Sequence, residues 1–530
     1  MSESAGTSTS AVAELPTALM FDAEKYTEQT ITITTDGGDK EVAYRFYGPL
    51  TYVANPVDTD HQSLVISVPV SIDGVAVDAR NAPIVFSNAV GGYMPATVKD
   101  ATGVGEASME MGDIGGGLPP LGGATGGGMP PMGGAAGMAP MGMTPTDGSA
   151  TGEVQSGGNA MLDARGGMVS LPKLALAAGY VSVEPGCRGR SLTDAAGIYY
   201  GTAPAAIVDL KAAIRYVKAN SSTIPGNTDR IVSTGTSAGG ALSALLGASG
   251  DSALYEPFLT ELGSADASDS VFATGAWCPI TDLEHADAAY EWNWGTNVTG
   301  TGELVDQTVS SELRSLFVED QNTLGLQGLE NFGPITAENY TDYLLQTYLQ
   351  PSSTEYLLAL SDSERTAYLA ANPFISWAND KATFTWPDYL SHVGARKKTE
   401  PAFDAFDLSA GENNLFGGGT TMARHFTQYS AQRDAAGLPG KAVEPGVEDN
   451  LVLMNPMYFV AKKNESRSRD WWIRLGTKDT DTALTISANL AAALDGLGDN
   501  VNHRMYWDEG HGSNTDAGDF IAWVGTVAGR

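Results

Sequence analysis

The stretch Arg230-Ile-Val-Ser-Thr-Gly-Thr-Ser-Ala-Gly-Gly-Ala-Leu-Ser-Ala-Leu-Leu-Gly247 contains the pattern Gly-x-Ser-x-Gly, with Ser237 at its centre. Residues 230–234 predict a strand, and the small residues at 238–247 predict a helix. A strand joined to a helix by such a tight turn holds the serine in a strained, exposed position. The flanking glycines suit the turn because larger side chains would collide across it. We therefore predict that Ser237 is a catalytic nucleophile.

The chain on both sides of this turn alternates between predicted strands and helices. Strands are expected at 180–184, 471–477 and 501–507, and helices at 171–178, 204–220, 483–497 and 516–528. That alternation predicts a parallel sheet covered by helices on both faces. The first part of the chain adds strands at 30–35, 42–47, 64–72 and 82–87. Together with the serine turn, the pattern predicts an α/β-hydrolase fold with a mostly parallel sheet and a large inserted lid.

Changes in composition suggest how the chain is divided. Residues 1–20 form a Ser/Thr-rich lead that we expect to be disordered. The α/β core is expected in two parts, 21–281 and 451–530, separated by a lid of helices and aromatic loops at 282–450. Within the first part, residues from about 102 to 159 are dominated by Gly, Met, Pro and Ala, without hydrophobic periodicity. Glycine at this density cannot offset its own ordering entropy, so we predict a flexible insertion there.

The charge of the chain narrows the classes of partner. Among 530 residues, 63 are acidic and 30 are basic, which leaves a formal charge of −33. This charge repels phosphate backbones and anionic lipids, so we expect no nucleic-acid partner and no membrane association. The start of the chain lacks the features of a secretory signal, which fits a cytoplasmic protein or an exported one whose signal has been removed. The sequence does not indicate the oligomeric state.

The chain has two cysteines, Cys187 and Cys278. Both stand in apolar or glycine-rich surroundings, so we expect core thiols, although the two could form one disulfide. No Cys/His cluster has the spacing of metal ligands, so we predict no metal site. Serine chemistry of the expected kind needs no cofactor.

A serine nucleophile needs a general base, which is usually histidine. In α/β-hydrolases the order along the chain is serine, acid, histidine, and this order leaves His503 and His511. His503 lies inside the predicted strand at 501–507, where a structural histidine is the commoner outcome. His511 follows that strand at the carboxyl edge of the sheet, where catalytic groups gather. We therefore prefer His511 as the base.

The acid that orients the base should follow the preceding strand at the same edge. Two aspartates, Asp479 and Asp481, stand directly after the strand at 471–477. We choose Asp479, which comes first, because Asp481 can be the N-cap of the next helix.

The oxyanion formed on attack needs two preorganised backbone N–H donors. Ala238, the residue after the nucleophile, is expected to supply one. The other is expected from the loop after the strand at 82–87, where Gly91 and Gly92 stand. We choose Gly92, in which case Gly91 is a turn residue.

Several blocks of the sequence carry a resemblance to a known family. They are APIVFSNAVGGYM (82–94), PAAIVDLKAAIRYVKAN (204–220), GTSAGGALSALLGASG (235–250), CPITDLEHADAAYEW (278–292), PAFDAFDL (401–408), GENNLFG (411–417), GTKDTDTAL (476–484) and WDEGHG (507–512). In this order they resemble the bacterial tannases, α/β-hydrolases that cleave galloyl esters. The resemblance covers most of the chain from about residue 21, but the tannases have only a short connection where this chain has 102–159. It implies a triad of Ser237, Asp479 and His511.

The resemblance also implies a gallate pocket that contains Lys398, Glu412 and Asp481. Without it, Lys398 in the run Arg396-Lys-Lys398 would be interpreted as a solvated charge. Carboxylates accept hydrogen bonds from the three phenolic hydroxyls of a galloyl group, and an ammonium donates to their oxygens. The three residue types therefore suit this ligand.

These observations predict a serine esterase that hydrolyses galloyl esters through a galloyl-serine intermediate and releases gallic acid. Its partners would be small-molecule galloyl esters and polyphenols. A feruloyl or other phenolic-acid esterase would use the same triad with a different acyl pocket. Outside enzymes, the alternative is a catalytically inactive hydrolase-fold binding protein, against which the intact set of serine, aspartate and histidine argues.

Overall fold

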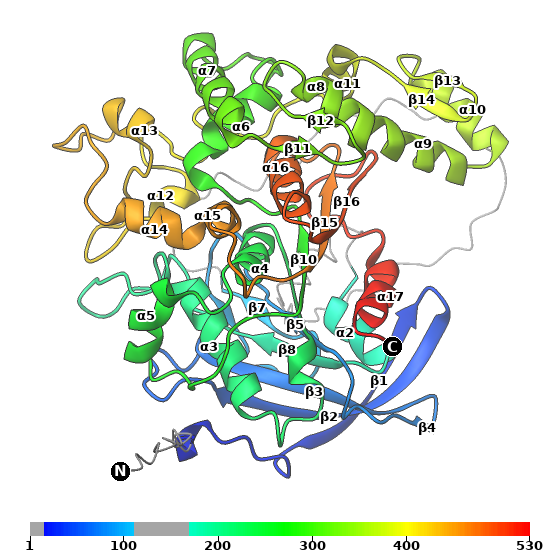
Figure 1. The fold of residues 1–530 in the computed structure, drawn as a ribbon. Helices are drawn as coiled ribbons and strands as arrows, with labels where there is room; N and C mark the ends of the chain where they lie inside the picture. Colours follow the sequence, from blue (N-terminus) through cyan, green and yellow to red (C-terminus); the bar gives the residue numbers. More distant parts are fainter. Residues whose placement is uncertain (1–14, 111–168) are drawn as a thin grey trace, which may run out of the picture.

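The computed structural model describes residues 15–110 and 169–530, and its main feature is one large mixed sheet (Figure 1). The strands lie in the order β1-β2-β3-β8-β5-β9-β10-β15-β16, and β4 pairs with β3. Their bounds are Thr27–Thr35 (β1), Gly38–Thr51 (β2), Ser63–Ile72 (β3), Val75–Ala76 (β4), Ile84–Ser87 (β5), Val181–Pro185 (β8), Ile231–Thr236 (β9), Ala273–Trp277 (β10), Asp470–Gly476 (β15) and Asn500–Tyr506 (β16).

The sheet has an antiparallel part and a parallel part. Strands β1, β2, β3 and β8 pair antiparallel in turn. From β8 through β5, β9, β10 and β15 to β16, every pair is parallel. Parallel strands place their carboxyl ends at one edge, so the loops after β5, β9, β10, β15 and β16 share that edge. This arrangement confirms the predicted α/β-hydrolase fold.

Helices pack directly on the parallel strands: α2 on β8, α4 on β9 and β10, and α16 on β15 and β16. Helix α4 lies close to β10 because its glycines leave room. A Cβ at Gly240 would collide with the Trp277 carbonyl oxygen, and one at Gly247 with Thr274. The core helices span Leu171–Ala177 (α2), Ala205–Ala219 (α3), Ala238–Ala248 (α4), Glu256–Glu261 (α5), Leu484–Asp495 (α16) and Ala517–Val527 (α17), with single 3₁₀ turns at Thr17–Leu19, Thr228–Arg230 and Ala253–Tyr255.

The chain between β10 and β15 is mostly helical, and in Figure 1 its helices α6 to α11 gather at the end of the molecule opposite β1–β4. The helices span Leu283–Trp294 (α6), Gln307–Leu324 (α7), Tyr340–Leu344 (α8), Gln350–Ala359 (α9), Asp362–Ala371 (α10), Trp386–Val393 (α11), Gly411–Leu415 (α12), Gln428–Gln432 (α13), Val447–Met454 (α14) and Pro456–Ala461 (α15), with a π-helix at Leu345–Leu349. Two short hairpins pair Gln327–Gly328 (β11) with Gly333–Pro334 (β12), and Ser376–Ala378 (β13) with Lys381–Thr383 (β14). The assignment of 282–450 as a separate lid stays a prediction.

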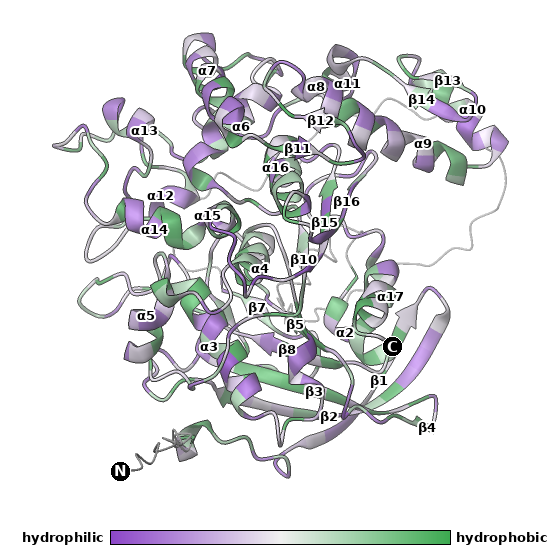
Figure 2. Ribbon diagram, viewed as in Figure 1, coloured by the Kyte–Doolittle hydropathy of each residue, from purple (hydrophilic) through white to green (hydrophobic). Residues whose placement is uncertain are grey.

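The core and the inserted helices differ in polarity. Strand β3 and helix α2 are mostly hydrophobic, whereas α10 is largely hydrophilic (Figure 2) and buries no residue. No helix in the described part of the chain is long and apolar enough to cross a membrane.

The segments predicted to be disordered (1–20) and flexible (about 102–159) each include some residues that the structure describes. In the lead predicted at 1–20, Leu19 is fully buried, so the part from residue 15 onward packs against the core. In the insertion predicted at about 102–159, Ser108–Met109 (β7) pairs with Ala96–Thr97 (β6). Residues 1–14 and 111–159, and with them most of both predictions, lie outside the described residues.

Candidate active site

Ser237 lies between β9 and α4, in the turn that the sequence pattern predicted. Its φ of +60° and ψ of −124° lie outside the regions that non-glycine residues normally adopt. The turn is tight on both sides: a Cβ at Gly235 would collide with the Gly239 carbonyl oxygen, and one at Gly239 with the side chain of Asn88. Strained backbone of this kind persists where the surrounding structure enforces it, often at functional sites.

The structure brings Ser237, Asp479 and His511 together from the loops that follow β9, β15 and β16 at one edge of the sheet. His511 Nε2 lies 2.8 Å from Ser237 Oγ, and His511 Nδ1 lies 2.8 Å from Asp479 Oδ2. The Asp479 carboxylate is fully buried, while the other two side chains are partly exposed. A substrate can therefore reach the serine and the imidazole, but not the acid that orients them.

The electrostatics of this group favour a positively charged imidazole. Burial opposes the charged form of His511, but the neighbouring Asp479 carboxylate and Cys278 together outweigh burial and hold the pKa of His511 well above its usual value. A base that becomes an imidazolium during catalysis is stabilised by this arrangement.

The alternative base, His503, has different surroundings. Both of its ring nitrogens lack a hydrogen-bond partner among the described residues, and its ring packs 4.6 Å from that of Tyr348. Burial lowers the pKa of His503 to about 3. His503 therefore lies neutral in the interior and does not contact Ser237.

The alternative acid, Asp481, does not cap helix α16, whose N-cap is Ala483. Instead its side chain accepts from Lys397 Nζ over 2.7 Å. Its backbone N–H donates to Asp479 Oδ1 over 2.9 Å, which helps to hold the carboxylate beside His511.

The loop after β5 is tied to the serine turn. Asn88 donates from Nδ2 to the carbonyl oxygens of Thr234 and Gly239, each over 3.1 Å. Gly239 N–H in turn donates to Val90 O over 3.1 Å. These bonds set the distance between the glycines of this loop and Ser237.

Gly92 and Ala238 both have backbone N–H groups without a hydrogen-bond partner among residues 15–110 and 169–530. Gly92 is exposed and has a φ of +55°, a conformation that favours glycine. Gly91 is half-buried, and a Cβ there would come within 2.9 Å of Met109 Sδ. Gly92 is thus the more accessible of the two glycines.

Arg190 donates a hydrogen bond to this loop. No motif in the sequence indicated this role. Arg190 is 4% exposed, donates from Nε to Gly92 O over 2.7 Å, and donates from Nη1 to Asn414 Oδ1 over 2.9 Å. Asn414 lies in α12, the helix that carries Glu412. Burial lowers the pKa of Arg190, and the charge of Glu412 acts against this decrease. The arginine therefore connects the glycine loop to the helix of a predicted pocket residue.

The run 396–398 contains three cations with three different environments. Arg396 is fully buried and pairs with Glu291, with Nη1 donating to Oε2 over 2.9 Å. Lys397, which no sequence motif singled out, pairs with Asp481. Lys398 Nζ lies 3.7 Å from the centre of the Phe403 ring. No local signal in the sequence separates these roles, because they depend on what each side chain meets in the fold.

Lys398 and Asp481 share one electrostatic environment. Burial opposes the charged form of Asp481, but the charges of His511, Lys397 and Lys398 together hold its pKa below the usual value. Of the predicted pocket residues, the structure thus places Lys398 and Asp481 in the neighbourhood of His511. Glu412 lies near Arg190, on the side of the glycine loop.

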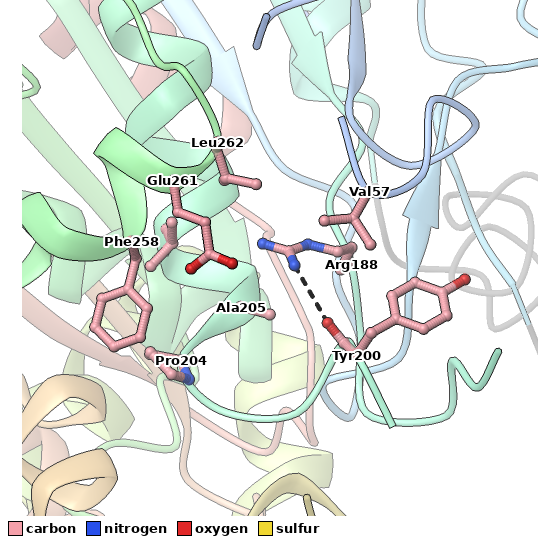
Figure 3. A pocket seen from close by; sticks show the side chains of 9 residues that line it. Val57, Arg188, Tyr200, Pro204, Ala205, Phe258, Glu261 and Leu262 are labelled. Carbon is pink, nitrogen blue, oxygen red and sulfur yellow. Dashed lines mark hydrogen bonds between the residues drawn. The ribbon is translucent and has the colours of Figure 1, made fainter. Parts of the chain in front are cut away.

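A separate cavity of about 180 Å³ lies beside α3 and α5 and is lined by Arg188, Tyr200, Glu261 and mostly apolar neighbours (Figure 3). None of the predicted site residues lines it. Arg188 there is already paired with buried Asp209 and donates to Tyr200 O over 3.2 Å. The Arg188 guanidinium in this cavity is therefore already paired within the protein.

Known proteins similar to this chain share one family of enzymes. A family model described as BD-FAE matches residues 167–315. No protein with a curated description matches the sequence. A solved tannin acyl hydrolase in complex with 3,4-dihydroxybenzoate is 30% identical and has a TM-score of 0.75, with 96% of this chain and 99% of that chain covered.

Two further structures are similar over the same extent, 96% of this chain and 99% of the other. Tannase from Fusobacterium nucleatum is 31% identical with a TM-score of 0.72. Native tannin acyl hydrolase from Lactobacillus plantarum is 29% identical with a TM-score of 0.74. Since identity of this level extends along nearly the whole of both chains, the chain belongs to the tannin acyl hydrolase (tannase) family of α/β-hydrolases.

Proposed function

We infer that this chain is a serine esterase that hydrolyses galloyl esters. One observation carries the mechanism: the relay from Asp479 through His511 to Ser237 Oγ, with 2.8 Å at each step. In the described part of the chain, the N–H groups of Gly92 and Ala238 have no hydrogen-bond partner and remain available to the substrate. The substrate class is supported by the solved tannin acyl hydrolase in complex with ethyl gallate, which is 30% identical to this chain.

In the first half-reaction, Ser237 Oγ attacks the ester carbonyl carbon while His511 Nε2 removes the hydroxyl proton. The charge that develops on the carbonyl oxygen is stabilised by the N–H groups of Gly92 and Ala238. Asp479 keeps the imidazole in the required tautomer and stabilises its positive charge. Collapse of the tetrahedral intermediate breaks the ester bond, and His511 passes its proton to the departing alcohol oxygen. The product is a galloyl-serine ester.

In the second half-reaction, water takes the place of the alcohol. His511 removes a proton from the water, whose oxygen attacks the galloyl carbonyl carbon. The second tetrahedral intermediate collapses with return of the proton to Ser237 Oγ. Gallic acid leaves, and the hydrogen bond between His511 and Ser237 forms again.

The acyl group is recognised by Lys398, Glu412 and Asp481 in this proposal. Lys398 donates to phenolic oxygens, and the two carboxylates accept from phenolic hydroxyls. The ion pair with Lys397 keeps Asp481 charged and oriented before the substrate arrives.

The decisive experiment compares steady-state hydrolysis of methyl gallate, methyl ferulate and methyl benzoate. We expect methyl gallate to have the highest kcat/KM, because only it offers three hydroxyls to the pocket. A higher kcat/KM for methyl ferulate would identify a different phenolic-acid esterase. Binding of gallate, seen as fluorescence quenching, without turnover of any ester would identify a binding protein instead.

A further inference from the structure

Cys278 contacts the catalytic base, but the proposed mechanism does not use it. It is the first residue after β10, is 2% exposed and has a φ of +37°. Its Sγ lies 3.9 Å from His511 Nε2, on the same nitrogen that faces Ser237 Oγ. One ligand atom each from Cys278, Asp479 and His511 lie within 4.8 Å of one another. The group combines a thiol, an imidazole and a carboxylate, the side chains that bind divalent metals.

The distance between sulfur and nitrogen suits one shared cation. Zinc binds thiolate at about 2.3 Å and imidazole at about 2.0–2.1 Å, so at a tetrahedral angle the two ligand atoms lie roughly 3.6 Å apart. Cys278 Sγ and His511 Nε2 would need to approach by only a few tenths of an ångström. Ser237 Oγ, 2.8 Å from the same nitrogen, is within reach as a third ligand.

The orientation of the imidazole also suits a metal. Metal-bound histidines usually donate their other ring N–H to a carboxylate, which fixes the tautomer and makes the ligand more basic. Asp479 accepts from Nδ1 in this way, over 2.8 Å. The feature that prepares His511 Nε2 to accept a proton therefore also prepares it to bind a cation.

We propose that Cys278 Sγ and His511 Nε2 form a binding site for a thiophilic divalent cation such as Zn²⁺ or Cd²⁺, whose occupation blocks esterase activity. Binding releases the Cys278 thiol proton to solvent and occupies the lone pair with which His511 would remove the proton of Ser237. Asp479 remains hydrogen-bonded to Nδ1. The site is open toward the substrate side, since Ser237 and His511 are only partly buried. The block of activity rests on the proposed role of His511 as base, whereas binding does not.

The test separates binding from inhibition. Binding is measured by titrating the wild-type enzyme with CdCl₂ and following the ultraviolet charge-transfer absorption of a cadmium thiolate. We expect one Cd²⁺ per chain. Cys278→Ser should remove the absorption, and Cys187→Ser should not, because Cys187 is the other cysteine and is fully buried elsewhere. Circular dichroism checks that each variant is folded, and Cys278→Ala is a second variant at the same position.

Inhibition is measured with methyl gallate at buffered free Cd²⁺ or Zn²⁺, each variant being compared with its own metal-free rate. We expect Cys278→Ser to raise the half-inhibitory concentration at least about tenfold, a loss of roughly 1.4 kcal/mol of binding, and Cys187→Ser to leave it unchanged. Unchanged absorption or inhibition in Cys278→Ser would overturn the proposal, as would binding without inhibition. Failure of the metal-free enzyme to cleave methyl gallate would contradict the proposed function, and the binding titration would still decide the cation site.

Discussion

Arg190 donates a hydrogen bond from Nε to the carbonyl oxygen of Gly92 over 2.7 Å. The same guanidinium reaches Asn414 in α12, and its own backbone N–H donates to Tyr93 O over 2.9 Å. A buried, charged donor thus holds the carbonyl side of Gly92, the residue whose N–H we assign to the oxyanion. Such support matters because catalytic donors must be held close to their productive geometry.

Arg190→Ala should lower kcat for methyl gallate by roughly 10- to 100-fold, the range expected when a catalytic group is misplaced by about 1 Å. KM should change less, because the acyl pocket remains. Added guanidinium should restore part of kcat in Arg190→Ala and have no effect on the wild-type enzyme. Loss of activity in proportion to loss of folded protein, without rescue, would show that Arg190 is only structural.

Ser237→Ala and His511→Ala should each reduce kcat by on the order of a thousandfold or more, because members of a triad act as a unit. Both variants should keep the wild-type circular dichroism spectrum, since neither side chain is a core residue. His503→Ala is the matched control and should keep most of the activity. An inactive His503→Ala variant beside an active His511→Ala variant would assign the base to the other histidine.

Asp479→Asn should reduce kcat on the order of 10⁴-fold and should also move the acid limb of the pH–rate profile. The base must be neutral to act, and Asp479 raises the pKa of His511. In the wild type, kcat/KM should therefore increase with pH through a midpoint above the usual histidine value of about 6.5. Without the carboxylate charge the pKa falls, so the limb should shift to lower pH. An unshifted limb would mean that another group controls it.

Lys398, Glu412 and Asp481 should decide which acyl group is accepted. A site built to bind hydroxyls can reject an analogue without them by roughly 10⁴-fold. Wild-type enzyme should therefore prefer methyl gallate strongly over methyl benzoate and over the tri-O-methylated ester. Lys398→Ala, Glu412→Ala or Asp481→Asn should reduce that preference, chiefly by lowering kcat/KM for methyl gallate. Comparable kcat/KM for all three esters in the wild type would show that no such pocket exists.

Asp287 should make stability depend on pH. Its carboxylate accepts hydrogen bonds from the backbone N–H groups of Phe403 and Asp404 over 2.7 and 3.1 Å. Phe403 is the residue whose ring Lys398 covers. Burial, followed by the charge of Asp404, raises the pKa of Asp287 to about 7. Between about pH 4 and pH 7, Asp287 is protonated in the folded state but ionised in the unfolded chain. The free energy of unfolding should therefore decrease as the pH rises through this range.

The measurement for this prediction is the free energy of unfolding by denaturant at pH 5 and pH 7.5, in wild type and Asp287→Asn. Between these two pH values the difference between the two proteins should change by about 2.5 kcal/mol in favour of the variant at the higher pH. A difference that stays constant with pH would show that Asp287 does not titrate in this range.

The local sequence was sufficient for the fold and for the position of Ser237. Strand, glycine turn and helix around Ser237 all lie within 18 consecutive residues, so short-range sterics and hydrophobic pattern specify them. The order of strands and helices then restricted the architecture, because parallel strands need helical crossovers. His511 could be preferred over His503 for the same reason, since its place after a strand puts it at the carboxyl edge.

Only the tertiary structure decided which side chains meet. Arg396, Lys397 and Lys398 are adjacent cations, yet one is buried against Glu291, one pairs with Asp481 and one covers Phe403. No periodicity distinguishes them, because each partner comes from a distant segment.

The neighbours of His511 likewise could not be predicted from the sequence. The absence of metal-ligand spacing around Cys278 led to the prediction of no metal site, but the fold places its sulfur 3.9 Å from a histidine 233 residues later. Arg190 likewise meets Asn414 across 224 residues. Residue type and order determined the chemistry available to this chain, whereas the long-range packing of the sheet edge against α12 and its neighbours determined which groups share a site.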